Sequence, residues 1–340
     1  NKSAFIRVKS VTNVMVDSLD NNGDFKSSAF GTLMPVAGTS GAFAGGLAAT
    51  STTGGFYEAA SGSNIQGFDP DDYTKGFSFL TDKDGVQFNL LLAPGISLHT
   101  DTATAANAAI TTVENRGDAV VLLDAGKYGT SVGQAVGNAG TFLSNYAATY
   151  YPWVQVYSNG LGKAVWCPPT TLMGGVIAYN DTTTAPWFTP AGINRGGVPG
   201  AVEIERTLPQ SDRDTLYFGR VNPLATFTGT GVTVFGQKTL QKKPSALDRL
   251  NVRRLLIALK EFIGGVARTL VFEQNTTATR NRFLAQVNPY LSSVVQRQGL
   301  YAYKVIMDAS NNTPDIIDQN KLVGQIYIQP TKAVEFVILN

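Results

Sequence analysis

The chain has 340 residues and a formal net charge of +2, from 27 Lys and Arg against 25 Asp and Glu, with a single His and a single Cys. No apolar run approaches the roughly 18 to 20 residues of a membrane-spanning helix, so membrane insertion is not expected. One Cys excludes an internal disulfide, and one Cys with one His excludes zinc sites built from several such ligands.

Charge is distributed unevenly along the chain. Residues 1–200 carry ten basic and fourteen acidic side chains, and residues 201–340 carry seventeen and eleven, so the two parts have net charges of −4 and +6. Oppositely charged parts can attract copies of the same chain head to tail, or an acidic partner. Two solvated faces of uneven composition are the alternative that the same numbers allow.

The first segment, residues 1–68, is predicted to be β-rich at its start and Gly/Ser/Thr-rich after it. Residues 4–16 are rich in β-branched residues and predict one or two strands. Residues 38–67 are dominated by Gly, Ala, Ser and Thr and predict a long surface loop. The chain starts without an initiator Met or a signal peptide, so a trimmed fragment is expected.

Residues 69–204 show the pattern of an α/β domain. Asp69 and Pro70 are a good N-cap and first-turn pair for a helix that runs to about Leu80. Strands are predicted over 86–92, 120–124 and 154–157, and helices over 102–114 and 132–150. This alternation is typical of a mostly parallel sheet.

Residues 205–340 change to an α+β pattern. Ser245 and Asp248 resemble a capping box for a helix that ends at Gly264 and Gly265. The remaining predicted elements are a strand over 267–272, a helix over 278–298 bent at Pro289, and strands over 301–307, 322–329 and 333–339. The last of these strands is expected to leave an open sheet edge.

Gly129-Thr130-Ser131-Val132-Gly133 is the strongest enzyme-like motif, because it fits the G-x-S-x-G nucleophile elbow. No strand directly precedes it, and the single His99 comes before Ser131 instead of after it. A triad of Asp84, His99 and Ser131 stays formally possible, since triads are defined by geometry. With 35 glycines such a match arises readily. We therefore interpret the motif as a Gly-rich turn, predict no enzyme, and keep a serine or carboxylate hydrolase as an alternative.

Phosphate and metal motifs are incomplete. Gly160-Leu161-Gly162-Lys163 lacks the upstream Gly of a Walker loop, and Gly229-Thr230-Gly231 is not followed by the third Gly of a dinucleotide motif. The acidic residues between 17 and 24 do not have the spacing of a calcium loop. We expect no cofactor and no metal site.

A basic cluster flanks and enters the predicted helix after Ser245. Its members are Lys242, Lys243, Arg249, Arg253 and Arg254. Arg249 and Arg253 are four residues apart and so share a helix face. A solvated face is one interpretation. Nucleic acid is not expected, because the overall charge is near neutral and no aromatic residues interleave with the basic ones. We predict contact with an acidic protein surface.

Several sequence motifs carry a resemblance to a known family. They are Tyr-Phe-Gly-Arg-Val-Asn-Pro at 217–223, Val-Phe-Gly-Gln-Lys-Thr at 234–239, Leu-Asp-Arg-Leu-Asn-Val-Arg-Arg-Leu at 247–255, Phe-Glu-Gln-Asn at 272–275, Asn-Asn-Thr-Pro at 311–314, Phe-Val-Ile-Leu-Asn at 336–340, and Ala-Gly-Ile-Asn-Arg-Gly at 191–196 after Trp166-Cys167-Pro168-Pro169. With these motifs the chain resembles the contractile tail sheath proteins of long-tailed phages, especially T-even phages, and more distantly the sheaths of R-type pyocins and type VI secretion systems. The resemblance is dense over residues 150–340, rests on element order over 70–150, and is weak over the first 60.

The resemblance implies a subtilisin-like α/β sheath domain that is not a protease, followed from about residue 205 by an inner α+β domain that lies against a tail tube. It implies a structural subunit that polymerises helically and contracts to drive the tube through the host envelope, with the energy stored in subunit interfaces. Tail tube protein, baseplate and tail terminator are the implied partners. The implied location is the virion, after assembly in the bacterial cytoplasm.

In this family, terminal arms add strands to a neighbour's sheet. The edge positions that we expect to take part are Ile326, Ile328, Val334, Phe336 and Ile338. The chain lacks both arms of the family pattern, so we expect this form to fold as a monomer and the full-length protein to polymerise. A phage scaffold protein other than a sheath is a further alternative, and it predicts rings or shells instead of tubes.

Overall fold

The computed structural model describes residues 70–227 and 229–335. The chain divides into two units, residues 1–48 and 49–340, and all that follows belongs to the second. The strands expected at 4–16, the loop expected at 38–67, and the edge positions Phe336 and Ile338 lie outside the described residues. Within the described part, no helix has both the length and the apolar character to cross a membrane.

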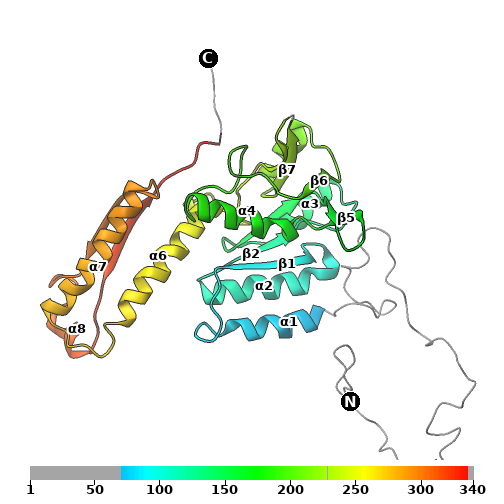
Figure 1. Cartoon of the computed structure of the whole chain (residues 1–340). Helices are drawn as coiled ribbons and strands as arrows, with labels where there is room; N and C mark the ends of the chain where they lie inside the picture. The colour runs from blue at the N-terminus through cyan, green and yellow to red at the C-terminus, as the bar shows by residue number, and fades with distance from the viewer. Residues whose placement is uncertain (1–69, 228, 336–340) are drawn as a thin grey trace, which may run out of the picture. The chain divides into compact units, whose positions relative to one another are not determined.

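A five-stranded sheet forms the centre of the described unit (Figure 1). Its order is β1 (Leu90–Ser97), β2 (Val120–Asp124), β3 (Ala147–Tyr151), β7 (Asn222–Phe227) and β8 (Gly231–Val234). The first four strands are parallel, and β8 is antiparallel to β7. Every residue of β2 and β3 is buried, which explains their continuous apolar runs.

Helices cover both faces of this sheet. One face packs on α1 (Pro70–Ser78), η3 (Phe79–Thr81), α2 (Ala103–Arg116), α3 (Val132–Gly140) and α5 (Gln210–Phe218), and the other on α4 (Thr170–Thr183) and on Leu250 and Ile257 of α6 (Leu250–Arg268). The short helix η4 (Thr100–Thr102) directly precedes α2. Successive residues of β2 divide between the two cores: Val121 and Leu123 belong to the first, Val120 and Leu122 to the second. This alternation follows from the two-residue period of a strand.

Strands that lie between β3 and β7 in the sequence form a smaller antiparallel sheet. Its order is β5 (Lys163–Cys167), β4 (Val154–Ser158) and β6 (Ala201–Ile204). The strand predicted over 154–157 is therefore confirmed, although it belongs to this second sheet and not to the parallel one.

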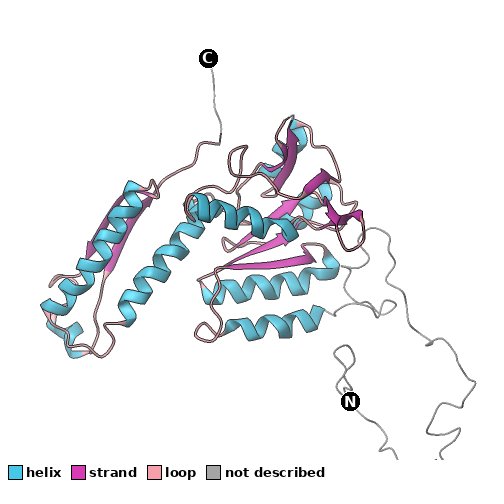
Figure 2. Cartoon of the chain, in the orientation of Figure 1, coloured by secondary structure: helices cyan, strands magenta, loops and turns pink. Residues whose placement is uncertain are grey.

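The remaining elements form what we call the C-terminal layer, residues 250–330. It contains α6 (Leu250–Arg268), α7 (Thr277–Gln296), β9 (Leu300–Ile306), α8 (Pro314–Asp318) and β10 (Gln325–Pro330), and is preceded by η5 (Ala246–Asp248). The antiparallel pair β9–β10 lies along α7 (Figure 2). Leu255 and Leu259 of α6 and Val287 and Leu291 of α7 are buried in its core.

Four predicted elements agree closely with the structure: the helices at 102–114 and 278–298 and the strands at 120–124 and 301–307. The strand predicted at 322–329 is β10 at 325–330. Of the strand predicted at 333–339, residues 333–335 lie in no strand and the others lie outside the described residues. The helix that starts at Pro70 is also present, and it continues as η3 to Thr81. The strand predicted at 86–92 lies at 90–97. The helix α6 passes through Gly264 and Gly265 and ends at Arg268, and Ser245 caps η5 through Leu247 N, not α6.

Two predictions are wrong. Residues 132–150 do not form one helix, because α3 ends at Gly140 and Ala147–Tyr151 form the buried strand β3. Residues 267–272 are not a strand, since α6 continues to Arg268 and Phe272 has a φ of 70° in the turn that follows. Strands β7 and β8, which follow residue 205, belong to the same sheet as β3.

Candidate functional site

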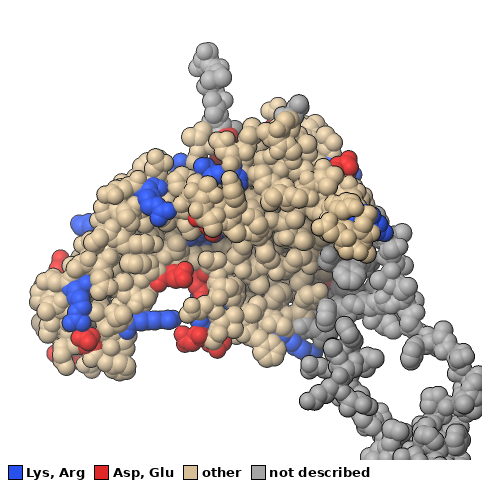
Figure 3. Space-filling view, in the orientation of Figure 1, with Lys and Arg blue, Asp and Glu red and all other residues tan. Residues whose placement is uncertain are grey.

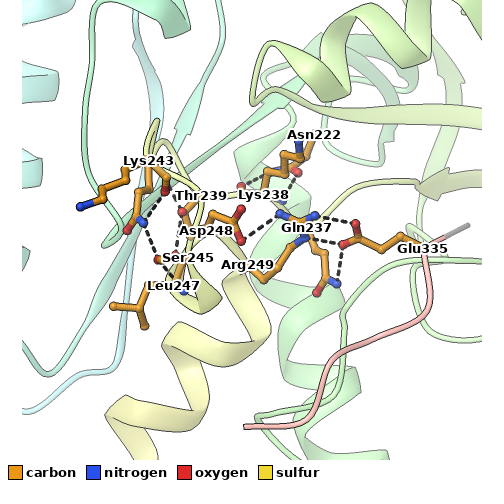
Figure 4. A network of polar contacts seen from close by, with 11 residues as sticks. Asn222, Gln237, Lys238, Thr239, Lys243, Ser245, Leu247, Asp248, Arg249 and Glu335 are labelled. Atoms are coloured by element: carbon orange, nitrogen blue, oxygen red, sulfur yellow. Dashed lines mark hydrogen bonds and ion pairs between the residues drawn. The ribbon is translucent and has the colours of Figure 1, made fainter. Parts of the chain in front are cut away.

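The start of α6 and residue 335 meet in the polar network of Figure 4, which we call the junction. Arg249 Nε and Nη2 donate to the two carboxylate oxygens of Glu335 at 2.5 and 2.7 Å. Its Nη1 lies 2.9 Å from Asp248 Oδ1, and Gln237 Nε2 donates to Glu335 Oε1 at 3.1 Å. Two parallel N–H groups of the guanidinium bond to the two carboxylate oxygens, and this bidentate pair fixes the orientation of Arg249 relative to Glu335.

The electrostatics of Glu335 follow from these contacts. Burial would raise the pKa of Glu335, but the hydrogen bonds from Arg249, Tyr217 and Gln237 outweigh it, and the pKa is held below its usual value. Burial likewise works against the charge of Arg249, and the bond to Glu335 raises its pKa nevertheless. Both groups therefore stay charged near neutral pH, and the ion pair is intact there.

Two predicted basic residues, Arg253 and Arg254, are buried and used inside the chain. Arg253 Nη2 donates to Asn145 Oδ1 at 2.6 Å, and its guanidinium lies 3.9 Å from the ring centre of Tyr146. Arg254 Nη1 donates to Asp181 Oδ1 at 2.8 Å, and its Nη2 pairs with the second oxygen of Asp181. These contacts join α6 to the segment before β3 and to the last turn of α4. In this conformation the two side chains are not available to a partner.

Lys242 and Lys243 differ from those arginines because both are exposed. In Figure 4 the Lys243 side chain points away from the junction, while its backbone oxygen accepts from Gln241 Nε2 at 2.7 Å. Neither ammonium group forms an ion pair with any residue of the described part. On the face drawn in Figure 3, Lys and Arg side chains lie scattered among uncharged residues instead of in one continuous patch.

The predicted edge residues fall into two groups. Ile326 and Ile328 lie in β10, half-buried against the core of the C-terminal layer. Val334 is exposed and follows β10 outside any strand. Because β9 and β10 form a two-stranded sheet, each keeps one edge without a partner strand among residues 70–227 and 229–335. Such edges can accept a further strand.

The residues of the formal triad have other roles. Ser131 is the N-cap of α3 and forms a complete capping box with Gln134. His99 Nδ1 lies 3.5 Å from Asp101, and Asp84 lies 3.5 Å from Arg268. The glycines at 160–162 and 229–231 lie in the turns of the β4–β5 and β7–β8 hairpins. Within the described ranges, no group of three His, Cys, Asp or Glu residues could hold a metal ion.

Asp124, a buried carboxylate at the end of β2, was not among the predicted site residues. Its oxygens accept from Gly95 N at 3.0 Å, Thr170 N at 3.1 Å and Thr170 Oγ1 at 2.9 Å. Burial raises the pKa of Asp124 to about 7, against the opposite effect of these bonds. Asp124 therefore ties β1 and the start of α4 to the central strand. The position of an acid directly after the apolar run 120–123 is the signal that could have identified it.

Comparisons with known proteins agree with the family indicated by the motifs. The family model of the phage tail sheath protein central domain matches residues 66–240, and that of the phage tail sheath C-terminal domain matches residues 242–340. The tail sheath protein of Vibrio phage KVP40 is 32% identical over 313 residues, 85% of this chain and 46% of that protein. The tail sheath protein of Enterobacteria phage T4 is 32% identical over 289 residues, 79% of this chain and 44% of that protein.

Solved structures have the same fold. The helical sheath of the anti-feeding prophage in its contracted state superposes with a TM-score of 0.64 at 25% identity, covering 81% of this chain and 76% of that chain. The sheath complex of an extracellular contractile injection system, also contracted, gives a TM-score of 0.65 at 24% identity and covers 78% and 73%. The chain spans about half the length of the curated relatives it matches.

Proposed function

The chain belongs to the phage tail sheath family, and from this membership we propose that it is a structural subunit of a contractile tail sheath. In this proposal copies of the subunit polymerise helically around a tail tube, and contraction of the assembly drives the tube through the host envelope. The observation that carries the proposal is the 32% identity over 85% of the chain to a protein named as a tail sheath protein. The protein is structural and not an enzyme.

The C-terminal layer supports the assembly step. Its two-stranded sheet has partnerless edges within the described chain, and strand addition at such an edge connects two chains by main-chain hydrogen bonds. We propose Ile326 and Ile328 as positions beside the added strand, and Val334, Phe336 and Ile338 as positions on the segment after β10. Main-chain bonds of this kind can persist while the bodies of two subunits move relative to each other.

Of the five basic residues, Lys242 and Lys243 suit a contact with an acidic surface of the tube or of a neighbouring subunit. Both are exposed and without an ion pair among the described residues. Arg249 contributes in this proposal by holding Glu335, and Arg253 and Arg254 by joining α6 to the rest of the chain.

The finer expectations belong to the same proposal. The four parallel strands flanked by helices support a subtilisin-like arrangement of the α/β part, and the sheath function implies a tube protein, a baseplate and a tail terminator as partners. The assembled sheath would be part of the virion after its assembly in the bacterial cytoplasm. We propose that contraction lowers the free energy stored in subunit interfaces, so that no nucleotide is required.

Negative-stain electron microscopy of the protein as its gene encodes it tests this function. Hollow striated tubes are expected, whereas rings or closed shells would favour a scaffold and dispersed particles would contradict assembly.

Lys242→Glu with Lys243→Glu should reduce tube formation, with Lys163→Glu as the control in an exposed position of the β4–β5 hairpin. A Ser131→Ala variant should assemble normally, since Ser131 is a helix cap; loss of a hydrolytic activity in that variant would revive the alternative of a hydrolase.

A further inference from the structure

A groove with a volume of about 1390 Å³ lies beside the junction. Aromatic side chains form much of its walls: Trp187 and Phe188 before β6, Tyr217 on α5, Phe235 after β8, and Tyr301 on β9. The extended residues 331–335 form a further side. Phe235 and Tyr301 are exposed, so the walls offer apolar surface to an occupant.

Two residues that line the groove have hydrogen-bond acceptors without a donor among residues 70–227 and 229–335. Asn251 and Gln237 are at least 95% buried, and neither Asn251 Oδ1 nor Gln237 Oε1 has a partner in this part of the chain. Asn251 Nδ2 donates to Trp187 O and Gln237 Nε2 donates to Glu335 Oε1, which fixes the orientation of each amide. The two residues lie on adjoining segments, because Leu250 N donates to Gln237 O at 2.8 Å. A buried acceptor left unpaired is costly, so an N–H donor from an occupant would be favourable.

The charges around the groove are mainly positive. Arg195, Arg213 and Lys332 line it. Arg297 lies 4.9 Å from the ring centre of Trp187, and Lys238 lies 4.3 Å from that of Tyr217. Of the two carboxylates that line the groove, Glu335 is paired with Arg249, which leaves Asp214. The field therefore favours an occupant with negative charge.

We propose that this groove binds an extended acidic polypeptide segment of another protein chain. Backbone N–H groups of such a segment supply donors for the two amide oxygens, its carboxylates face Arg195, Arg213 and Lys332, and its apolar side chains cover the aromatic walls. A basic segment satisfies the amide oxygens and opposes the cations, and a neutral segment lacks the charge contacts. The inference does not depend on the sheath function.

The test uses a nine-residue peptide, Asp-Ser-Leu-Asp-Asn-Asn-Gly-Asp-Phe, which has the sequence of residues 17–25 and carries three carboxylates with two apolar side chains. Its control has Asn at the three Asp positions. Binding is followed by calorimetry and by tryptophan fluorescence, because Trp187 lines the groove. We expect the acidic peptide to bind at least about tenfold more tightly than the neutral one. Added salt should weaken the binding of the acidic peptide.

Variants locate the binding. Arg195→Gln with Lys332→Gln should remove most of the preference for the acidic peptide, and Lys163→Gln, outside the groove, should not. Asn251→Leu should weaken both peptides equally; because it also removes the hydrogen bond from the amide nitrogen to Trp187 O, its melting temperature is measured to show that the variant stays folded. Trp187→Phe should abolish the fluorescence response and leave the calorimetric signal.

Four results would overturn the proposal. They are equal affinity for the acidic and neutral peptides, no binding of the acidic peptide at millimolar concentration, binding that the groove variants leave unchanged, and tighter binding of a peptide with Lys at the three Asp positions. None of these results bears on tube formation, so the sheath function is judged separately.

Discussion

The central sheet and the C-terminal layer are built from similar elements but differ in burial and in strand pairing. The strands β2 and β3 are buried at every residue and have neighbours on both sides, and β2 ends in the hydrogen-bonded carboxylate of Asp124. The pair β9–β10 keeps one exposed face, with Tyr301 and Tyr327 about 60% exposed, and two edges without a partner strand in the described chain. The inner strands of the central sheet are thus paired on both sides, whereas each strand of the C-terminal layer keeps an edge at which we propose that another chain adds a strand.

The loss of unfolding free energy on truncating an apolar side chain should differ most strongly between the two regions. Leu122→Ala in the centre of β2 should cost about 4 kcal/mol of the free energy of unfolding, because a fully buried side chain leaves a cavity. Ile328→Ala in β10 should cost about 1 kcal/mol, since that side chain is only half-buried and its site can relax. Urea unfolding followed by circular dichroism measures both. Similar losses would mean that the C-terminal layer is packed as firmly as the body.

The connection between the regions can be tested at Arg254. Arg254→Ala should destabilise the chain by about 3 kcal/mol, because it leaves Asp181 with a partly buried and unpaired charge. The control Arg268→Ala removes an ion pair to Asp84 in which both side chains are largely exposed. It should cost at most about 0.5 kcal/mol. Equal effects in thermal unfolding would show that the buried arginine does not join the regions.

The junction is expected to control residues 331–335 locally. Glu335→Gln keeps the shape of the side chain and removes its charge, so these residues should open more easily by about 1 to 2 kcal/mol. Hydrogen–deuterium exchange of this segment reports the change, with β2 as the internal reference. The charge-swapped pair Arg249→Glu with Glu335→Arg should restore part of the protection. Exchange that Glu335→Gln leaves unchanged would assign the protection of residues 331–335 to other contacts.

The two regions should also differ in their response to pH. The folded-state pKa of Asp124 is about 7, above its ordinary value of 3.8, so the folded body binds this proton more strongly and its stability falls as pH rises from about 4 to about 7. Glu335 has a lowered pKa, so the junction is strongest above the ordinary value of 4.5 and weakens as pH falls through the folded-state value. Melting temperatures between pH 4 and 8 should show the first trend. Asp124→Asn should flatten it, and an unchanged slope in that variant would refer the trend to another group.

Elements with a strong local signal could be predicted from the sequence. The apolar run 120–123 identifies β2, and the amphipathic pattern identifies α2 and α7. The strand β3 was predicted as helix because Ala147 and Ala148 have high helix propensity, and only the neighbouring strands select the extended form there. Tertiary context decided that segment, and no local pattern reports it.

The candidate site was predictable in composition and not in role. The basic cluster is visible in the sequence, but the partners of Arg253 and Arg254 lie 108 and 73 residues away along the chain. The same charges therefore serve either a surface or an interior, and only the fold distinguishes them. Glu335 is also 86 residues from Arg249, so no spacing rule connects the two sides of the junction.

The closure of residues 249–335 into a loop by one bidentate ion pair has a mechanical consequence. A pull on the chain beyond Glu335 is transmitted first to Arg249 at the start of α6, and through α6 to the buried contacts of Arg253 and Arg254. The helix α7 and the pair β9–β10 lie within the loop and outside that load path. The elements with open edges can thus remain folded while tension passes around them into the central body.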